Sequence, residues 1–408
     1  MRPGAAWGAW PERGLFGALL LLALTAPFSI ALSQSALALA LLLAAAGLAA
    51  GWRPARTGVE FFALAFAAWG LADIAFSLDP GESLGHAKRF LLLPAHWLFA
   101  AAAVTERRRE WILAALGAGA AGVAVYGIIA CAAGPGGLAL RANLTQGYMT
   151  AGGIMMLAGL VLVAFAATLP GRRARWLAAA ALLPVLGALV LTQTRSAWLG
   201  FAAGGLVALL LARPRWAAVF AALLVAGGFA APERYRARLL SAFDPAHPDN
   251  RQRLVMWDTA RRILADRPWT GTGDLDLREI HRGYHPGEDV EAVGHLHSNP
   301  AMFAAIWGWP GLVLALALLL ALGALLARRW LALRAAGPRA PPLARGWALA
   351  GLAAWTGFMV GGLFEWSFGD AEIALLLWSL TGLGLAPAAI PPETGFEATA
   401  ADGGEAAP

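Results

Sequence analysis

The chain has 408 residues, of which 59% are hydrophobic and only 14% are charged. Ordinary soluble domains carry about 45–50% apolar and about 25% charged residues, so the composition excludes a soluble enzyme. The net charge of +6 does not indicate a nucleic-acid partner, because most of the basic residues separate apolar runs instead of forming one patch. These numbers predict an all-α, polytopic membrane protein.

Apolar runs recur along almost the whole chain. About 20 such residues are needed to cross about 30 Å of hydrocarbon as a helix. The runs predict a membrane helix bundle of about 12 transmembrane helices, at 14–32, 35–51, 58–77, 89–104, 111–133, 147–169, 176–192, 196–212, 216–231, 300–327, 346–364 and 371–388. The first run is longer than a usual signal-peptide core and a second follows at once, which favours a span over a cleaved signal.

The basic residues indicate the orientation of these spans. Seventeen lie in one set of short loops, four in the alternate loops and ten in a single long segment. Because Lys and Arg gather on the cytoplasmic side, both termini are predicted to be cytoplasmic, in a bacterial inner membrane. The expected organisation is transmembrane helices 1–9 in 1–231, a large periplasmic loop with short helices in 232–298, transmembrane helices 10–12 in 299–390, and a disordered cytoplasmic tail in 391–408.

Two short outer loops carry charges that could contact a substrate. The first has Lys88 and Arg89 beside an acidic stretch, and the second has Glu365, Asp370 and Glu372 within eight residues. Carboxylates at a membrane boundary could orient a sugar or pair with arginines. An equally good interpretation is that they are solvated loop charges.

Arg195 stands between two apolar runs on the side where positive charge is otherwise avoided. Ionisable residues near membrane depth are costly and are candidates for function, although an arginine can also extend to the interface. Arg253, in the long loop, is predicted to lie on the same side. Two guanidinium forks suit a diphosphate, because each can donate two hydrogen bonds and neither loses its charge. The sequence does not distinguish Arg251, Arg261 and Arg262 from Arg253 as contacts for the diphosphate.

The long loop holds five of the seven histidines and eleven of the 25 acidic residues. Loops of this length are usually functional. Its pattern predicts a surface helix over about 250–266, followed by a turn in which Gly271 and Gly273 allow backbone to approach a ligand closely.

The sequence from His295 to Pro300 reads as the start of a helix, with Ser298 or Asn299 as the cap. An imidazole fixed at a membrane boundary can act as a general base, and His297 and His295 are the candidates. The competing interpretation is an ordinary capping or loop histidine.

A metal site is another interpretation of the histidines, because His281 and His285 are four residues apart and His295 and His297 are two apart. Imidazole and carboxylate ligands would suit a transition metal. Gly283 disfavours the regular helix that would align the first pair, and no metal site is predicted.

The chain resembles the O-antigen ligase family, whose members share about a dozen spans and one large periplasmic loop. Four features carry the resemblance: Thr194-Arg195-Ser196-Ala197-Trp198; Arg253-Leu254-Val255-Met256-Trp257 followed by Asp266-Arg267-Pro268-Trp269-Thr270-Gly271-Thr272-Gly273; His297 with Gly308; and Ser77-Leu78-Asp79-Pro80 followed by Ser83-Leu84 and Lys88-Arg89. The sequence departs from the family pattern at one position. Family members usually have Asn directly after the second histidine, whereas here Ser298 follows His297 and Asn299 comes next.

The resemblance implies a transferase that moves a glycan from undecaprenyl diphosphate to a sugar hydroxyl of lipid A-core, with inversion and with no metal or other cofactor. His297 would be the base, and Arg195 and Arg253 would hold the diphosphate. Substrate contacts are expected from Lys88, Arg89, His295, Gly271, Gly273, Glu365 and Asp370. Membrane lipids and a glycan acceptor are the other expected partners.

The sequence is also compatible with two other functions. A polysaccharide polymerase or a protein O-oligosaccharyltransferase would use a similar donor and a different acceptor. A transporter or flippase would need ionisable residues near the centres of its spans and paired interrupted helices. Here the polar residues gather on one face, which favours chemistry at the membrane surface.

Overall fold

In the computed structural model, residues 9–134, 137, 141–287 and 294–390 are described, and within them the fold is entirely helical, with no strand. The predicted all-α fold is therefore confirmed. The expected disordered tail, 391–408, lies outside the described residues. The α-helices before the long loop are α1 (Ala9–Thr25), α2 (Ile30–Ala49), α3 (Glu60–Ala72), α4 (Pro80–His86), α5 (Ala95–Ala102), α6 (Glu106–Ala133), α7 (Tyr148–Thr168), α8 (Arg172–Leu191), α9 (Arg195–Ala212) and α10 (Pro214–Ala230).

The long loop and the C-terminal part are helical as well. They comprise α11 (Glu233–Leu240), α12 (Pro248–Asp266), α13 (Arg278–Tyr284), α14 (Asn299–Ala335), α15 (Pro342–Gly361) and α16 (Ala371–Leu385), and short 3₁₀ turns occur at η1 (Asp73–Phe76), η2 (Ala87–Leu92), η4 (Ser241–Phe243) and η5 (Gly337–Arg339). The surface helix expected at 250–266 is α12, which begins two residues earlier.

Each of the twelve predicted spans overlaps a helix, but the helices differ in length. In the described part of the chain, six helices are long and apolar enough to cross a membrane, and a seventh is added if the bent pair Pro214–Ala230 and Glu233–Asp266 counts as one span. The six are α2, α6, α7, α8, α9 and α14. The chain is thus a multi-pass helical membrane protein, and twelve spans stay a prediction.

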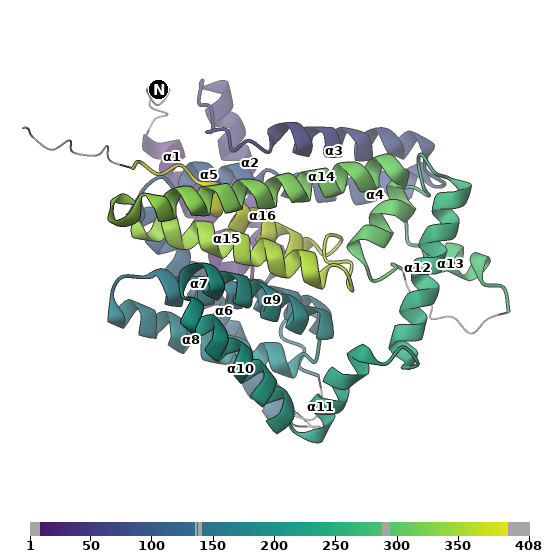
Figure 1. The fold of residues 1–408 in the computed structure, drawn as a ribbon. Coiled ribbons are helices and arrows are strands. Elements are labelled where there is room, and N and C mark those ends of the chain that lie inside the picture. The colour runs from purple at the N-terminus through teal and green to yellow at the C-terminus, as the bar shows by residue number, and fades with distance from the viewer. Residues whose placement is uncertain (1–8, 135–136, 138–140, 288–293, 391–408) are drawn as a thin grey trace, which may run out of the picture.

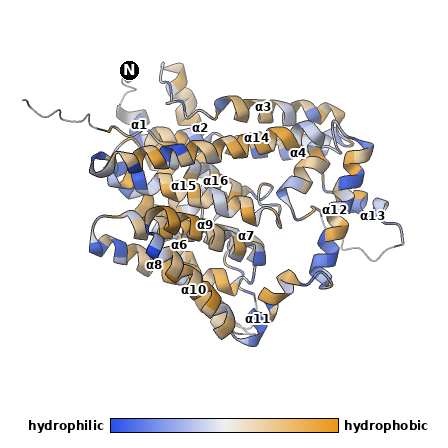
Figure 2. Ribbon diagram, in the orientation of Figure 1, coloured by the Kyte–Doolittle hydropathy of each residue, from blue (hydrophilic) through white to orange (hydrophobic). Residues whose placement is uncertain are grey.

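The long helices lie roughly parallel, and α12 and α13 stand at one end of them (Figure 1). In Figure 2 hydrophobic residues predominate along the bundle, while hydrophilic residues gather at its two ends and on α12 and α13. The centre of the bundle is α7, which is buried along almost its full length. Apolar burial on every side is what a central membrane helix requires.

Small residues allow the central helices to approach closely. A Cβ on Gly200 of α9 would lie 2.5 Å from the carbonyl oxygen of Gly357 in α15, and one on Gly204 would lie 2.5 Å from that of Ala353. Where lipid removes the hydrophobic force between helices, such backbone contact is a main source of packing energy. The closely packed pair fixes the positions of Arg195, at the start of α9, and of the loop that follows α15.

The turn after α12 is attached to α14 at a kink. Gly308 has φ +63°, and the backbone N–H of Trp309 donates to Pro268 O at 2.8 Å. The backbone N–H groups of Thr272 and Gly273 donate to Ala305 and Ile306 at 2.9 and 3.0 Å. These hydrogen bonds fix the long loop to the bundle next to the first turns of α14.

Candidate active site

His297 pairs with Glu365 at the end of the bundle that carries the long loop. Its Nδ1 lies 3.1 and 3.2 Å from the two carboxylate oxygens of Glu365. The side chains are 12% and 11% exposed, so the pair is largely shielded from water but accessible. Neither the pairing nor its distance could be obtained from the sequence, where the two residues are 68 positions apart.

The backbone around His297 is held in an uncommon conformation. His297 has φ +45°, in the left-handed region that few non-glycine residues adopt. The next residue, Ser298, is the cap of α14, one of the two residues predicted for that role, and it accepts a hydrogen bond from Ala301 N at 3.4 Å. Asn299 is buried, and its Oδ1 accepts from Phe368 N at 3.0 Å, which ties the helix start to the loop that carries Glu365. The two elements therefore hold imidazole and carboxylate together.

The charges of this site follow from burial and hydrogen bonding. Burial raises the pKa of Glu365, but hydrogen bonding to His297 and the nearby imidazoles outweigh it, so the pKa lies below its usual value. Burial, reinforced by the neighbouring His297, lowers the pKa of His295 to about 4. At neutral pH the site thus has one ionised carboxylate and a neutral His295.

His295 completes a compact group with the pair. The His295 and His297 rings are 4.3 Å apart between centroids, and His295, His297 and Glu365 each offer a ligand atom within 4.8 Å of the others. The other two histidines of the metal hypothesis, His281 and His285, are arranged differently. Both are buried and share the Thr259 hydroxyl, at 2.7 and 3.0 Å.

Arg195 lies in a second polar cluster, formed by α9, α11 and α12. Its side chain is buried, with Nη1 donating to Ser241 Oγ at 2.9 Å and Nη2 to Asp249 Oδ2 at 3.3 Å. Arg238 donates to the same Asp249 oxygen at 2.8 Å. The positive charges of Arg238, Arg253 and Arg141 lie close enough to repel the positive charge of Arg195. One partly exposed carboxylate thus faces several guanidinium groups, which leaves a net positive site.

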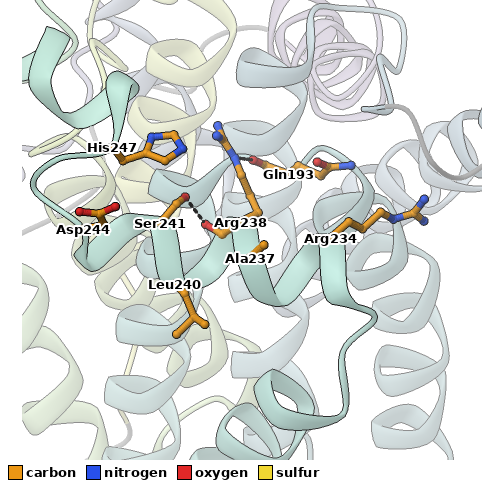
Figure 3. A pocket seen from close by; sticks show the side chains of 8 residues that line it. All are labelled: Gln193, Arg234, Ala237, Arg238, Leu240, Ser241, Asp244 and His247. Carbon is orange, nitrogen blue, oxygen red and sulfur yellow. Dashed lines mark hydrogen bonds between the residues drawn. The ribbon is translucent and has the colours of Figure 1, made fainter.

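A cavity of about 490 Å³ adjoins this arginine cluster (Figure 3). Arg234, Arg238 and His247 line it, together with Gln193, Ala237, Leu240, Ser241 and Asp244. Arg238 donates to Gln193 O at 3.4 Å, and Ser241 to Arg238 O at 2.8 Å. The lining is mainly basic and polar, which fits an anionic ligand.

Helix α12 joins the two clusters. Arg253 and Trp257 are one turn apart on it, and the Trp257 ring lies 6.3 Å from that of Phe364, the neighbour of Glu365. The three residues predicted to be catalytic, Arg195, Arg253 and His297, therefore lie on elements that meet at the same end of the bundle.

Arg89, in η2, lies next to the loop that carries Glu365. Its Nε lies 2.9 Å from Asp274 Oδ2, and its guanidinium stands 5.7 Å from the centre of the Trp366 ring. The backbone N–H of Trp366 in turn donates to Glu365 at 3.1 Å. Lys88 is exposed and shares with Arg89 a smaller cavity of about 250 Å³, which has leucines of α2 in its wall.

The two glycines of the turn have a structural explanation. Gly271 and Gly273 have φ +60° and +84°, and a Cβ on them would lie 2.2 Å from Ala305 O and 2.0 Å from Ser77 Oγ.

Asp370 also has a structural role. It is the N-cap of α16, and its Oδ2 accepts from Thr150 at 2.5 Å. That Gly271, Gly273 and Asp370 contact a substrate stays a prediction.

Sequence reasoning missed Asp249 and Arg238, which accompany Arg195, and Asp274, which pairs with Arg89. Asp249 directly precedes the predicted start, at 250, of the surface helix that holds Arg253. Its position four residues before Arg253 was the available signal, because residues four apart share a helix face.

Residues 179–316 match the model of a family described as O-antigen ligase. The similarity to this family covers about a third of the chain, including the long loop. The ligase-family segment begins within α8, ends just after the kink in α14, and includes Arg195, Arg253, His295 and His297. Glu365 and Arg89 lie outside it.

One chain of a solved structure entitled "Structural coordination of polymerization and crosslinking by a peptidoglycan synthase complex" has 21% sequence identity and a TM-score of 0.46. That alignment covers 82% of this chain and 97% of the other. No curated protein matches the sequence. The family match indicates a ligase- or polymerase-like activity on glycans in a membrane.

Proposed function

We propose that the protein transfers a glycan from undecaprenyl diphosphate to a sugar hydroxyl of lipid A-core, at the periplasmic face of the bacterial inner membrane. The observation that carries the proposal is the His297 and Glu365 pair at the end of the bundle where the arginine cluster also lies. With most of the Arg residues at the opposite loops, this end is assigned to the periplasm and both termini to the cytoplasm.

The pair supplies a base of the required kind. With Nδ1–H donating to ionised Glu365, the Nε2 of His297 carries no proton and can accept one from the acceptor hydroxyl. The resulting imidazolium is stabilised by the carboxylate 3.1 Å away. The hydroxyl oxygen attacks the anomeric carbon as the bond from that carbon to the phosphate oxygen breaks, and the anomeric centre is inverted.

The arginine cluster acts on the leaving group. Undecaprenyl diphosphate departs with the bonding electron pair, and Arg195 and Arg253 neutralise the negative charge that develops on it. Asp249 and Ser241 hold the Arg195 fork in place, at 3.3 and 2.9 Å. Because fixed guanidinium groups supply this charge, the transfer as proposed needs no metal ion.

The experiment uses the purified protein with a lipid-linked donor and three acceptors in separate reactions: lipid A-core, free oligosaccharide of the donor type, and a serine-containing polypeptide. Glycosylated lipid A-core is the expected product. Extension of the oligosaccharide would replace the ligase assignment with a polymerase, and a glycosylated polypeptide would replace it with a protein O-oligosaccharyltransferase. An inactive preparation that binds donor normally would overturn the transferase assignment itself.

A further inference from the structure

The group formed by His295, His297 and Glu365 has the composition of a transition-metal site. Two imidazoles and one carboxylate are a common donor set for zinc in proteins, and they leave a fourth position open. Two of the three donors are two residues apart, immediately before the capped start of α14, and the third is fixed by its hydrogen bond to Trp366 N. The group is therefore presented by two ordered segments.

The distances suit a small tetrahedral ion. Zinc bonds of about 2.0–2.2 Å place neighbouring ligand atoms about 3.3 Å apart. His297 Nδ1 already lies 3.1 and 3.2 Å from the Glu365 oxygens, and the ligand atoms of all three residues are within 4.8 Å of one another.

His295 supplies a second, independent observation. Its Nδ1 is buried, and no hydrogen-bond partner for it exists among the residues that the structure describes. A buried polar atom without a partner costs about 1–3 kcal/mol. The proposed transfer mechanism does not use this nitrogen, so a ligand that accepts its lone pair would account for it.

We propose that His295, His297 and Glu365 bind Zn²⁺ or a similar divalent transition metal, and that binding reversibly inhibits the enzyme. This inference rests on the proposed function of His297. When a metal occupies Nδ1 of His297, the proton of the neutral ring must lie on Nε2. Nε2 is then a donor and cannot accept the proton of the acceptor hydroxyl. The metal also takes the Glu365 carboxylate away from the imidazole.

The test combines a binding measurement with an activity measurement. Titration of metal-free protein with Co²⁺, followed by its d–d absorption, should show one site whose signal depends on all three residues, and calorimetry should give the Zn²⁺ affinity. Zn²⁺ should inhibit glycan transfer over the same concentration range in which it binds, and a chelator should restore the full rate.

Variants make the assignment specific. His295→Gln removes one metal ligand while the His297 and Glu365 pair remains, and each variant is compared with its own metal-free rate. Since even partners of ligands contribute about 10–100-fold to metal affinity, losing a ligand should raise the inhibiting Zn²⁺ concentration at least about 100-fold. His247→Gln, which removes a partly exposed histidine of the same loop, should leave it unchanged.

The outcomes separate the two proposals. Equal Zn²⁺ affinity and inhibition in wild type and His295→Gln would overturn the metal site, as would full wild-type activity at saturating Zn²⁺. A three-residue Co²⁺ site in a protein that transfers no glycan would support metal binding and overturn the proposed function instead.

Discussion

Replacement of Glu365 by Gln tests how the carboxylate supports His297. The amide oxygen of Gln can still accept the Nδ1 proton, so the ring orientation is retained while the negative charge is lost. At 3.1 Å and an effective dielectric constant of about 20, the attraction between an imidazolium and this carboxylate is about 5 kcal/mol.

Only part of that energy is lost in the variant. The side chains are 12% and 11% exposed, so solvent screens the pair to some degree, and the neutral hydrogen bond to Gln recovers about 1 kcal/mol. We take about 3 kcal/mol as the loss of transition-state stabilisation, which corresponds to about a 100-fold decrease in kcat. The KM for the lipid-linked donor should stay within about threefold, because the arginine cluster is untouched.

The assay is initial-rate glycan transfer by purified variants in nanodiscs, with expression and melting temperature recorded for each. The matched control is Glu279→Gln, an exposed carboxylate of the long loop that pairs with Arg282 and should keep wild-type kcat. A Glu365→Gln enzyme with kcat within twofold of wild type would show that the carboxylate does not support the base.

Three further changes have expected results. Arg195→Ala should lower kcat by about 100- to 1,000-fold and Arg195→Lys by about tenfold, since Lys keeps the charge but loses the fork, and a normal rate in the Ala variant would contradict the leaving-group role. Gly271→Ala should destabilise the protein by about 2 kcal/mol or more in thermal unfolding, because its Cβ would lie 2.2 Å from a carbonyl oxygen, whereas Gly283→Ala, with open space around it, should not. The free energy of unfolding should also fall as pH drops from about 6.5 towards about 4. His295 has a pKa of about 4 in the folded state and about 6.5 in the unfolded state, so the unfolded state binds more protons in that window. Melting temperatures that do not change between pH 7 and pH 5 would contradict this.

The sequence was informative where local chemistry determines structure. Ser298 and Pro300 predicted the start of α14, and the amphipathic pattern predicted α12 to within two residues. The apolar runs predicted the helical bundle, because lipid requires backbone hydrogen bonds to be satisfied within each segment. The number of spans was harder to predict, because several of the apolar runs form helices shorter than a membrane span requires.

The sequence was less informative about side chains that meet across the fold. Glu365 was chosen only as one of several loop carboxylates, and its pairing with His297 depends on the packing of α14 against the loop between α15 and α16. Asp249 was missed because its partner Arg195 is 54 residues away on another helix. Gly271 and Gly273 were interpreted as contacts for a ligand, while their φ values and close neighbours show what the turn itself requires.

The central claim is that His297 is the general base of glycan transfer, and a single-turnover measurement on His297→Ala tests it most directly. Enzyme in excess is mixed with labelled lipid-linked donor and lipid A-core, while donor binding is measured on the same sample. General-base catalysis contributes about 10²–10⁴-fold, so we expect normal donor binding and a transfer rate lower by about three orders of magnitude. A transfer rate within tenfold of wild type, with normal folding and donor binding, would contradict the account.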